Sequence, residues 1–396
     1  MSKTNKNTMD MTHGTLWNKI LIFALPLAAS SILQQLFNSI DTAVVGRFAS
    51  SQALAAVGSN SSLIALMINL FIGISLGSNV VIAHYIGQRS EKNIQAAIHT
   101  AIVVALVSGI FVMIFGQFIA KPVLSLMGTP DDVIDLAVVY LRINLLGMPF
   151  IMLYDFGSSI LRSTGDSRRP LYSLIVAGVI NTVLNLVLVI GFKMGVSGVA
   201  IATVISNMVS SGIIVYILTH ESAPIRLEFR KLAVAPAELK KILVIGVPAG
   251  IQGMMFSIAN VCIQSAINSF GSDAIAGSAA ALNYEYFTYF LVNAFAQATV
   301  TFTSQNYGVG KYKRMDRVLR DCMILSVSVS LIMGILVYVF GPELLHIYTS
   351  EEDVIQCGME ILTYTTLTYF FCGLMDLFPG ALRGMGHSTV PMILSI

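Results

Sequence analysis

The chain has 396 residues, of which 55% are hydrophobic and only 11% are charged, and its mean hydropathy is +0.78. A soluble domain carries about 25% charged residues, so the composition excludes a water-soluble globular protein and indicates that lipid covers most of the surface. The net charge of +2 says little about partners, and we expect no nucleic-acid partner. Four cysteines lie within or beside apolar segments without a CxxC pair, so we expect neither a disulfide frame nor a metal site.

Long apolar runs recur along the whole chain, and each is long enough to cross about 30 Å of hydrocarbon. Strand-like alternation is lacking, so helices rather than a barrel satisfy the backbone in lipid. We therefore predict an all-α polytopic membrane protein. The predicted spans are 16–46, 53–86, 96–120, 133–160, 171–192, 195–219, 242–270, 274–306, 321–341 and 354–380, with another beginning near 389.

Lysine and arginine are distributed unevenly between the two sides of these spans. With the N-terminus in the cytoplasm, only Arg47, Lys121, Arg142 and Lys193 of the 23 basic residues fall outside the cytoplasmic tail and loops. The positive-inside rule thus predicts a multi-pass protein of the cell (cytoplasmic) membrane with a cytoplasmic N-terminus. The first fifteen residues are polar and precede no short apolar core with a cleavage site, so we expect no cleaved signal peptide.

The chain contains an internal repeat. The segment LRSTGDSRRP at 161–170 matches LRGMGHSTVP at 382–391 at an offset of 221, and TPDDVI at 129–134 matches SEEDVI at 350–355 at the same offset. We predict two homologous six-helix lobes in parallel orientation, 1–219 and 242–396, joined by a basic cytoplasmic linker at 220–241. The second lobe ends after about four helices, so we expect that it is truncated.

Powered transport and enzymatic functions lack their motifs. Gly310-Lys311 is followed by Tyr312, and Gln305 replaces the first glycine of a Walker A loop, so we expect no nucleotide partner. No HExxH motif and no paired nucleophile and base occur, which argues against an enzyme.

Polar residues inside the first and fifth spans are the strongest functional signal. Gln34, Asn38 and Asp41 share one helical face, and Asn181 and Asn185 form an i, i+4 pair. A carboxylate at the centre of a membrane helix costs at least about 2.5 kcal/mol, so it must face partners or water. Carboxylate, amide and hydroxyl oxygens bind hard cations, although the same site could bind a proton instead. The alternative is that Asp41 only forms a packing hydrogen bond.

The paired LRxxGxSxxP-type loops, Pro26 fifteen residues before Asp41, and the two six-span halves resemble the multidrug and toxic compound extrusion (MATE) family. The resemblance implies a twelve-helix, V-shaped pair of lobes that exports organic cations and amphipathic drugs in exchange for Na⁺ or H⁺, without a cofactor. We expect a monomer. The family's N-terminal cation site maps to Asp41, Asn181, Asn185 and Thr203, where Asn185 replaces an acid.

An acid amid aromatic residues suits an organic cation through charge and cation–π attraction, although aromatic stretches also serve packing. The candidate residues of a substrate cavity are Glu285, Tyr284, Tyr289, Gln252, Asn260 and Asp376.

Two acids each precede a loop arginine by seven residues, Asp155 before Arg162 and Asp376 before Arg383. The simpler interpretation is that each acid pairs with its arginine at a cytoplasmic helix end, and the alternative is that the acids line the cavity mouth or relay protons. Pro26 predicts a kink, and bending of that span during transport is a hypothesis.

The second candidate function is a lipid-linked oligosaccharide flippase of the same superfamily. Flippases line their cavity with several arginines that bind pyrophosphate, and the sequence places only Arg142 inside a span. That count favours a drug exporter.

Overall fold

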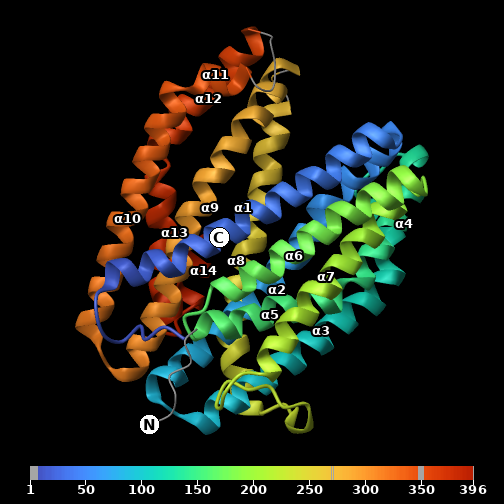
Figure 1. The fold of residues 1–396 in the computed structure, drawn as a ribbon. Coiled ribbons are helices and arrows are strands. Elements are labelled where there is room, and N and C mark those ends of the chain that lie inside the picture. Colours follow the sequence, from blue (N-terminus) through green and yellow to red (C-terminus); the bar gives the residue numbers. More distant parts are fainter. Residues whose placement is uncertain (1–7, 269, 271, 347–351, 396) are drawn as a thin grey trace.

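The computed structural model describes residues 8–268, 270, 272–346 and 352–395, and these are almost entirely helical (Figure 1). The helices follow the chain in this order: α1 (Leu16–Phe48), α2 (Ser51–Gln88), α3 (Glu91–Leu126), α4 (Asp131–Leu146), α5 (Met148–Ser163), α6 (Arg168–Asn185), the π-helical turn η1 (Leu186–Gly191), α7 (Gly195–Thr219), the 3-10 turn η2 (Phe229–Lys231), α8 (Pro236–Asn268), α9 (Ser272–Val309), α10 (Tyr312–Val339), α11 (Gly341–His346), α12 (Glu352–Thr368), α13 (Phe370–Gly384) and α14 (Thr389–Ser395). The predicted all-α class is confirmed.

Within the described residues, seven helices are long and apolar enough to cross a membrane, or nine if each of two bent pairs counts as one span. Helix α9, where 274–306 was predicted to span, is 38 residues long but is not among them because it carries many polar side chains. Several of its polar residues, such as Thr299, Ser304 and Asn306, are fully buried.

Two spans predicted as continuous are bent, which corrects the predictions for 133–160 and 354–380. Helices α4 and α5 meet at 45°, and α12 and α13 meet at 44°. Pro149 lacks the N–H that would continue the hydrogen-bond ladder of α4, which explains the first break. Nothing in the structure explains the second break, beside Tyr369. The predicted span 171–192 also changes character, because α6 passes into the π-helical turn η1.

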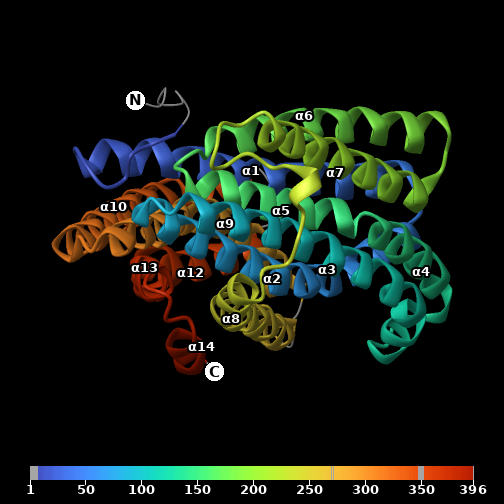
Figure 2. The same ribbon diagram turned by 90° about the horizontal axis from the view of Figure 1, so that it is seen from below.

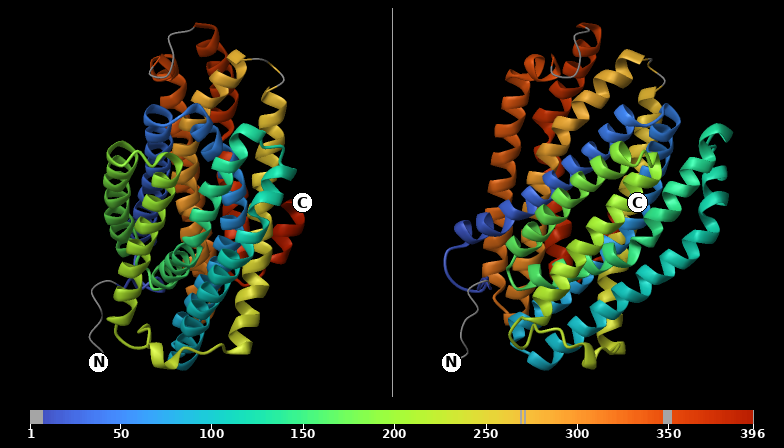
Figure 3. Two further views of the ribbon diagram at one scale, coloured as in Figure 1. Left: turned by 90° about the vertical axis from the view of Figure 1, so that its right-hand side faces the viewer. Right: turned by 45° about the vertical axis from the view of Figure 1, so that its right-hand side comes forward.

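The helix bounds repeat along the chain at the spacing of the sequence repeat. Helices α2 and α9 begin 221 residues apart and have the same length, and the two bent pairs recur at the same spacing. Figures 1 and 3 show that the second-half helices α10–α13 diverge from α2–α7 toward the top of the view, while the connection between α7 and α8 lies at the bottom. We call this bottom the linker end.

The first helix of each half contacts the other half. Helix α8 packs mainly along α2 of the first half, whereas α1 packs along both α6 of the first half and α9 of the second half. Figure 2, seen from the linker end, shows α8 beneath α2 and α1 beside α9. The divergent halves therefore share one seam, formed by α1, α2, α8 and α9.

Glycines bring the backbones of this seam into direct contact. A Cβ on Gly73 of α2 would lie 2.1 Å from the backbone nitrogen of Gly250, and a Cβ on Gly250 would lie 2.5 Å from the Leu70 carbonyl oxygen. Toward the linker end, Cβ atoms on the repeat-related Gly87 and Gly308 would each lie 2.2 Å from a carbonyl oxygen of the other helix. Membrane helices approach most closely where small residues face each other, so the seam depends on these glycines.

The N-terminal segment forms a strap (residues 8–14) that contacts both halves at the linker end. The Met9 amide donates to the Thr164 carbonyl of the first half at 3.1 Å. Asn306 Nδ2 of the second half donates to the Met11 carbonyl at 3.2 Å, and Arg314 Nη2 donates to the His13 carbonyl at 3.0 Å. Met11 is fully buried beneath these contacts, so the strap ties the two halves together where they are closest.

We expect Gly73→Ala to destabilise the protein, because the new methyl group would meet backbone atoms that cannot move independently. Overpacking of this kind costs about 1–3 kcal/mol, which corresponds to a melting temperature lower by several degrees. The matched control is Gly58→Ala in the same helix, where a Cβ meets nothing within 4 Å. Thermal unfolding of the two variants in detergent checks this, and equal melting temperatures would contradict the role of the seam.

Candidate functional site

A buried carboxylate lies at the junction of α1, α6 and α7. Asp41 is 9% exposed, and Asn185 Nδ2 donates a hydrogen bond to its Oδ1. The same Asn185 nitrogen lies 3.1 Å from Asn181 Oδ1, and Thr203 Oγ1 lies 3.4 Å from Asp41 Oδ2. The structure therefore brings together Asp41, Asn181, Asn185 and Thr203, the four residues to which the resemblance maps a cation site, and we call them the Asp41 cluster.

The local packing explains why these side chains meet. Gly178 of α6 lies under the Phe37 ring of α1, where a Cβ would lie 1.8 Å from the ring, so the two helices approach closely one turn before Asn181. Asn181 and Asn185 are one turn apart and face α1, and the π-helical turn η1 begins directly after Asn185. Single π-helical turns inside α-helices are frequent at functional sites.

The Asp41 cluster contains one formal charge and several oxygen atoms that lack a strong donor. In the described part of the chain, no lysine, arginine or histidine forms an ion pair with Asp41. Asn185 is fully buried, and its Oδ1 has no hydrogen-bond partner there. The single hydroxyl hydrogen of Thr203 has a closer acceptor in the Val199 carbonyl, at 3.0 Å. The carboxylate oxygen Oδ2 of Asp41 therefore receives at most one long hydrogen bond, from Thr203.

Tyr140 of α4 joins this site and was missed by the sequence reasoning. Its ring is buried among Val44, Val45 and Val189, and it lies close enough to Asp41 for the two groups to interact electrostatically. Tyr140 belongs to an apolar stretch without a motif, so the sequence contains no signal that would have identified it.

Gln34 and Asn38 take no part in the Asp41 cluster. Both side chains are exposed on α1, and neither forms a hydrogen bond to the cluster among the described contacts. They share the helical face that the sequence predicts, but α6 and α7 cover only its last turn, at Asp41. Pro26 lies inside α1, where its carbonyl accepts a hydrogen bond from Ser30 Oγ at 2.8 Å.

A second polar group runs along α9. Glu285, Tyr289, Asn293 and Gln297 follow one another every four residues, and we call them the α9 stripe. Asn293 Nδ2 lies 3.3 Å from the Tyr289 hydroxyl, and Gln297 Nε2 lies 2.9 Å from Asn293 Oδ1. Asp376 of α13 lies beside Asn293. Sequence reasoning missed Asn293 and Gln297, although their spacing of four residues from Glu285 and Tyr289 could have indicated them.

The expected ion pairs between Asp155 and Arg162 and between Asp376 and Arg383 are not formed, which corrects the simpler interpretation of these residues. In the described structure no ion pair links either acid to its arginine. Arg162 Nη1 instead donates to Gln297 Oε1 at 3.2 Å, and Arg383 donates to Gln252 Oε1. Seven residues separate each acid from its arginine, so they lie two turns apart along the helix, and the neighbouring helix supplies a nearer amide.

Three other candidate residues have different surroundings. Gln252 is buried in α8 and also donates to Ser395 Oγ at 2.7 Å. The Tyr284 hydroxyl donates to the Leu344 carbonyl at 2.8 Å, which is a packing contact within the second half. Asn260 is exposed on α8, outside both polar groups.

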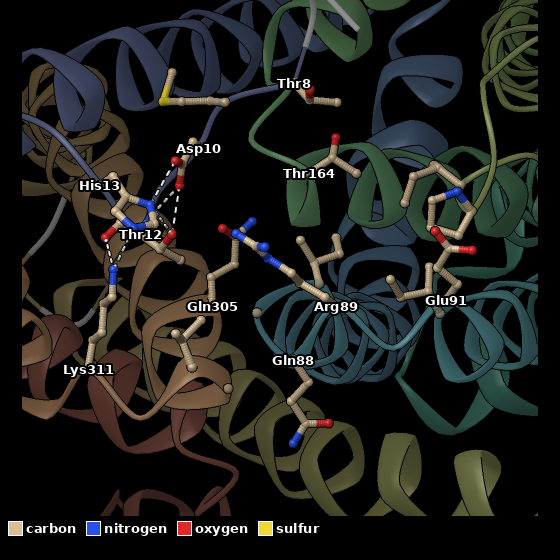
Figure 4. A pocket seen from close by; sticks show the side chains of 18 residues that line it. Thr8, Asp10, Thr12, His13, Gln88, Arg89, Glu91, Thr164, Gln305 and Lys311 are labelled. Atoms are coloured by element: carbon tan, nitrogen blue, oxygen red, sulfur yellow. Dashed lines mark hydrogen bonds and ion pairs between the residues drawn. The ribbon is translucent and has the colours of Figure 1, made fainter. Parts of the chain in front are cut away.

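A pocket of about 820 Å³ lies at the linker end, between the strap and the ends of α2 and α9. Figure 4 shows Asp10 and His13 of the strap on one side, where His13 lies next to Lys311, and Arg89 and Gln305 near the centre. Partial burial raises the pKa of Asp10, but hydrogen bonds from Thr12 and His13 outweigh it and lower the pKa to about 2. The pocket contains none of the predicted site residues.

Comparisons with known proteins identify related chains. The family model described as MatE matches residues 26–187 and 248–396. The probable multidrug resistance protein YoeA of Bacillus subtilis is 29% identical over 98% of this chain and 86% of its own length. The probable multidrug resistance protein NorM of Thermotoga maritima is 26% identical over 95% of this chain and 82% of its own.

Solved structures share the fold. An outward-facing multidrug resistance MATE family transporter of the MOP superfamily superposes with a TM-score of 0.93 over 100% of this chain and 88% of its own, at 23% identity. A MATE protein in the bent conformation gives a TM-score of 0.91 over 100% of this chain and 87% of its own, at 23% identity.

We expect Asn185→Ala to destabilise the protein more than Asn181→Ala, because only Asn185 contacts Asp41 directly. Loss of a hydrogen bond to a charged group costs about 1.5–3 kcal/mol. Asn181 acts on Asp41 through Asn185, so the two effects should not add in the double variant. Melting temperatures of the single and double variants test this, and strictly additive losses would show that the two residues act independently.

Proposed function

Because the chain belongs to the MatE family of multidrug and toxic compound extrusion transporters, we propose that it exports drugs and organic cations by antiport against Na⁺ or H⁺. Relatives over nearly the whole chain bear the names of multidrug resistance and export proteins. The observation that carries the proposal is the Asp41 cluster, a carboxylate withdrawn from water with amide and hydroxyl oxygens around it.

The cluster is suited to hold the coupling ion. A carboxylate with amide and hydroxyl oxygens is a donor set for hard cations, and a single negative charge matches a monovalent one. A proton on Asp41 would complete one contact, toward Thr203, and would leave Asn185 Oδ1 without a donor. The oxygens therefore favour Na⁺ over H⁺. Because Asn185 is neutral, the charge of the cluster rests on Asp41 alone.

Ion entry and drug exit would be linked by alternating access of the two lobes, 1–219 and 242–396. The two separate family matches and the repeated helix bounds support this division. The excess of lysine and arginine at the linker end supports a cytoplasmic N-terminus and a multi-pass protein of the cell membrane. An inward ion gains about 2.3 kcal/mol per charge for each 100 mV of membrane potential.

The substrate would contact the α9 stripe together with Asp376. Glu285 and Asp376 supply negative charge, and Tyr289, at 36% exposure, supplies an accessible aromatic face. Aromatic faces and carboxylates together attract organic cations. We propose that amphipathic or cationic drugs bind here and that the protein acts as a monomer without a cofactor.

We expect Asp41→Asn to abolish efflux, because the amide cannot carry the charge that holds the ion. Ethidium accumulation in pump-deficient cells measures this, and the control is Asp135→Asn, an exposed acid that lies 3.8 Å from Lys121. The control should export like the parent chain. Undiminished efflux in Asp41→Asn would refute the coupling role.

The coupling ion can be identified with proteoliposomes. At fixed pH, we expect drug uptake to rise with a Na⁺ gradient and to fall at least tenfold when Na⁺ is replaced by choline, because the Asp41 cluster offers more oxygens than one proton can satisfy. Uptake driven equally by a pH gradient without Na⁺ would instead assign proton coupling.

A further inference from the structure

The polar side chains of the α9 stripe are at least partly exposed on one side of the helix. Between Val292 and Val300, every side chain is buried except Asn293 and Gln297, which are partly exposed. Over this stretch the apolar faces of α9 are thus covered by neighbouring helices, while the polar face remains accessible.

Arg162 opens toward the same accessible side. From Phe156 to Ser167 on α5 and its following loop, Arg162 alone is not fully buried. Its Nη1 donates to Gln297 Oε1 at 3.2 Å, so its guanidinium lies at the end of the α9 stripe. This contact also crosses between the two halves of the chain.

Arg383, the repeat counterpart of Arg162, lies near the same stripe. It is partly exposed on α13 and donates to Gln252 of α8. Arg383 and Asp376 are both close enough to Tyr289 to interact with it electrostatically. Two arginines from equivalent positions of the repeat therefore flank one accessible strip.

Neither arginine has an anionic partner in contact. Within the described ranges, no ion pair involves Arg162 or Arg383, and the Nε of each is buried without a hydrogen-bond partner. Each guanidinium is bonded to a neutral amide oxygen only. A buried guanidinium without an anion in contact is unfavourable, because its charge is removed from water without full compensation. Asp155 interacts electrostatically with Arg162, and Asp376 with Arg383, but neither acid contacts its arginine, so each guanidinium still lacks an anion in direct contact.

From this we infer that Arg162 and Arg383 form an anion-accepting subsite that binds the carboxylate of a zwitterionic substrate whose amine faces Glu285. Glu285 and Gln297 are twelve residues apart, which is about 18 Å along a helix. The Tyr289 ring lies between them along the stripe. A molecule with an amine at one end and a carboxylate at the other matches this sequence of charges, whereas a simple cation matches only the acidic part.

This inference rests on the proposed export function, and matched ligands separate the two. Norfloxacin carries an amine and a carboxylate, norfloxacin ethyl ester has the carboxylate masked, and ethidium is a permanent cation. The variants are Arg162→Gln and Arg383→Gln, with Arg168→Gln, an exposed arginine at the first position of α6, as the control. Binding to the purified full chain is measured by fluorescence anisotropy, and efflux is measured in pump-deficient cells.

We expect each glutamine variant to bind norfloxacin at least tenfold more weakly than the parent chain, since a charge-assisted hydrogen bond is lost. Binding of the ester and of ethidium should change by less than about twofold, and Arg168→Gln should alter none of the three. If a glutamine variant does not fold, Arg383→Lys or Arg162→Lys replaces it. Lysine keeps the charge but lacks the paired N–H groups of arginine, so norfloxacin alone should weaken.

A parallel loss of all three ligands, or no selective loss of norfloxacin, would overturn the subsite. A parent chain that exports ethidium but does not bind norfloxacin would overturn the subsite and leave the proposed function intact. A parent chain that exports none of the three ligands would overturn the proposed function itself.

Discussion

The buried carboxylate of Asp41 constrains how the helices of the first half can pack, because it must be surrounded by polar groups. An isolated charge in the membrane interior is unfavourable by several kcal/mol unless polar groups surround it, and Asp41 receives those groups from two other helices. Gly178 permits α6 to approach α1 closely, and the π-helical turn directly after Asn185 redirects the chain toward α7. The close packing of α1, α6 and α7 thus places the polar groups of the Asp41 cluster around the carboxylate. These polar groups in turn make the burial of Asp41 energetically acceptable.

The two halves of the repeat use the same backbone for different polar groups. The helix bounds and the two bends recur, but the first half collects its polar residues at the junction of α1, α6 and α7, while the second half carries them along α9 and α13. Duplication provides two equivalent frameworks whose side chains can diverge. In the function that we propose, one framework holds the coupling ion and the other binds the larger substrate.

Much of the architecture could be predicted from the sequence. Apolar runs are a strong signal because lipid tolerates few alternatives to a helix, and the repeated loop located the equivalent positions. Asp41 was identified because an acid in an apolar run is conspicuous, and the family resemblance added Thr203 to the cluster. Tyr140 and the bend beside Tyr369 could not be predicted, since both depend on contacts between distant helices.

The paired arginines show the same limit. Spacing alone suggested that Arg162 would pair with Asp155, whereas α9 supplies Gln297 as a nearer partner. The sequence places only Arg142 in a span, but the structure adds Arg162 and Arg383 among the helices. A count of arginines is therefore a weaker argument against a flippase than the sequence alone suggests.

The strap has a practical consequence for anyone who purifies this protein. Because Met9 and Met11 are held between both halves, an affinity tag or fluorescent fusion placed immediately before them would pull on the contact that joins the bundles. A fusion at that end therefore requires a long flexible spacer, so that the tag used for purification does not disturb the contact between the two halves.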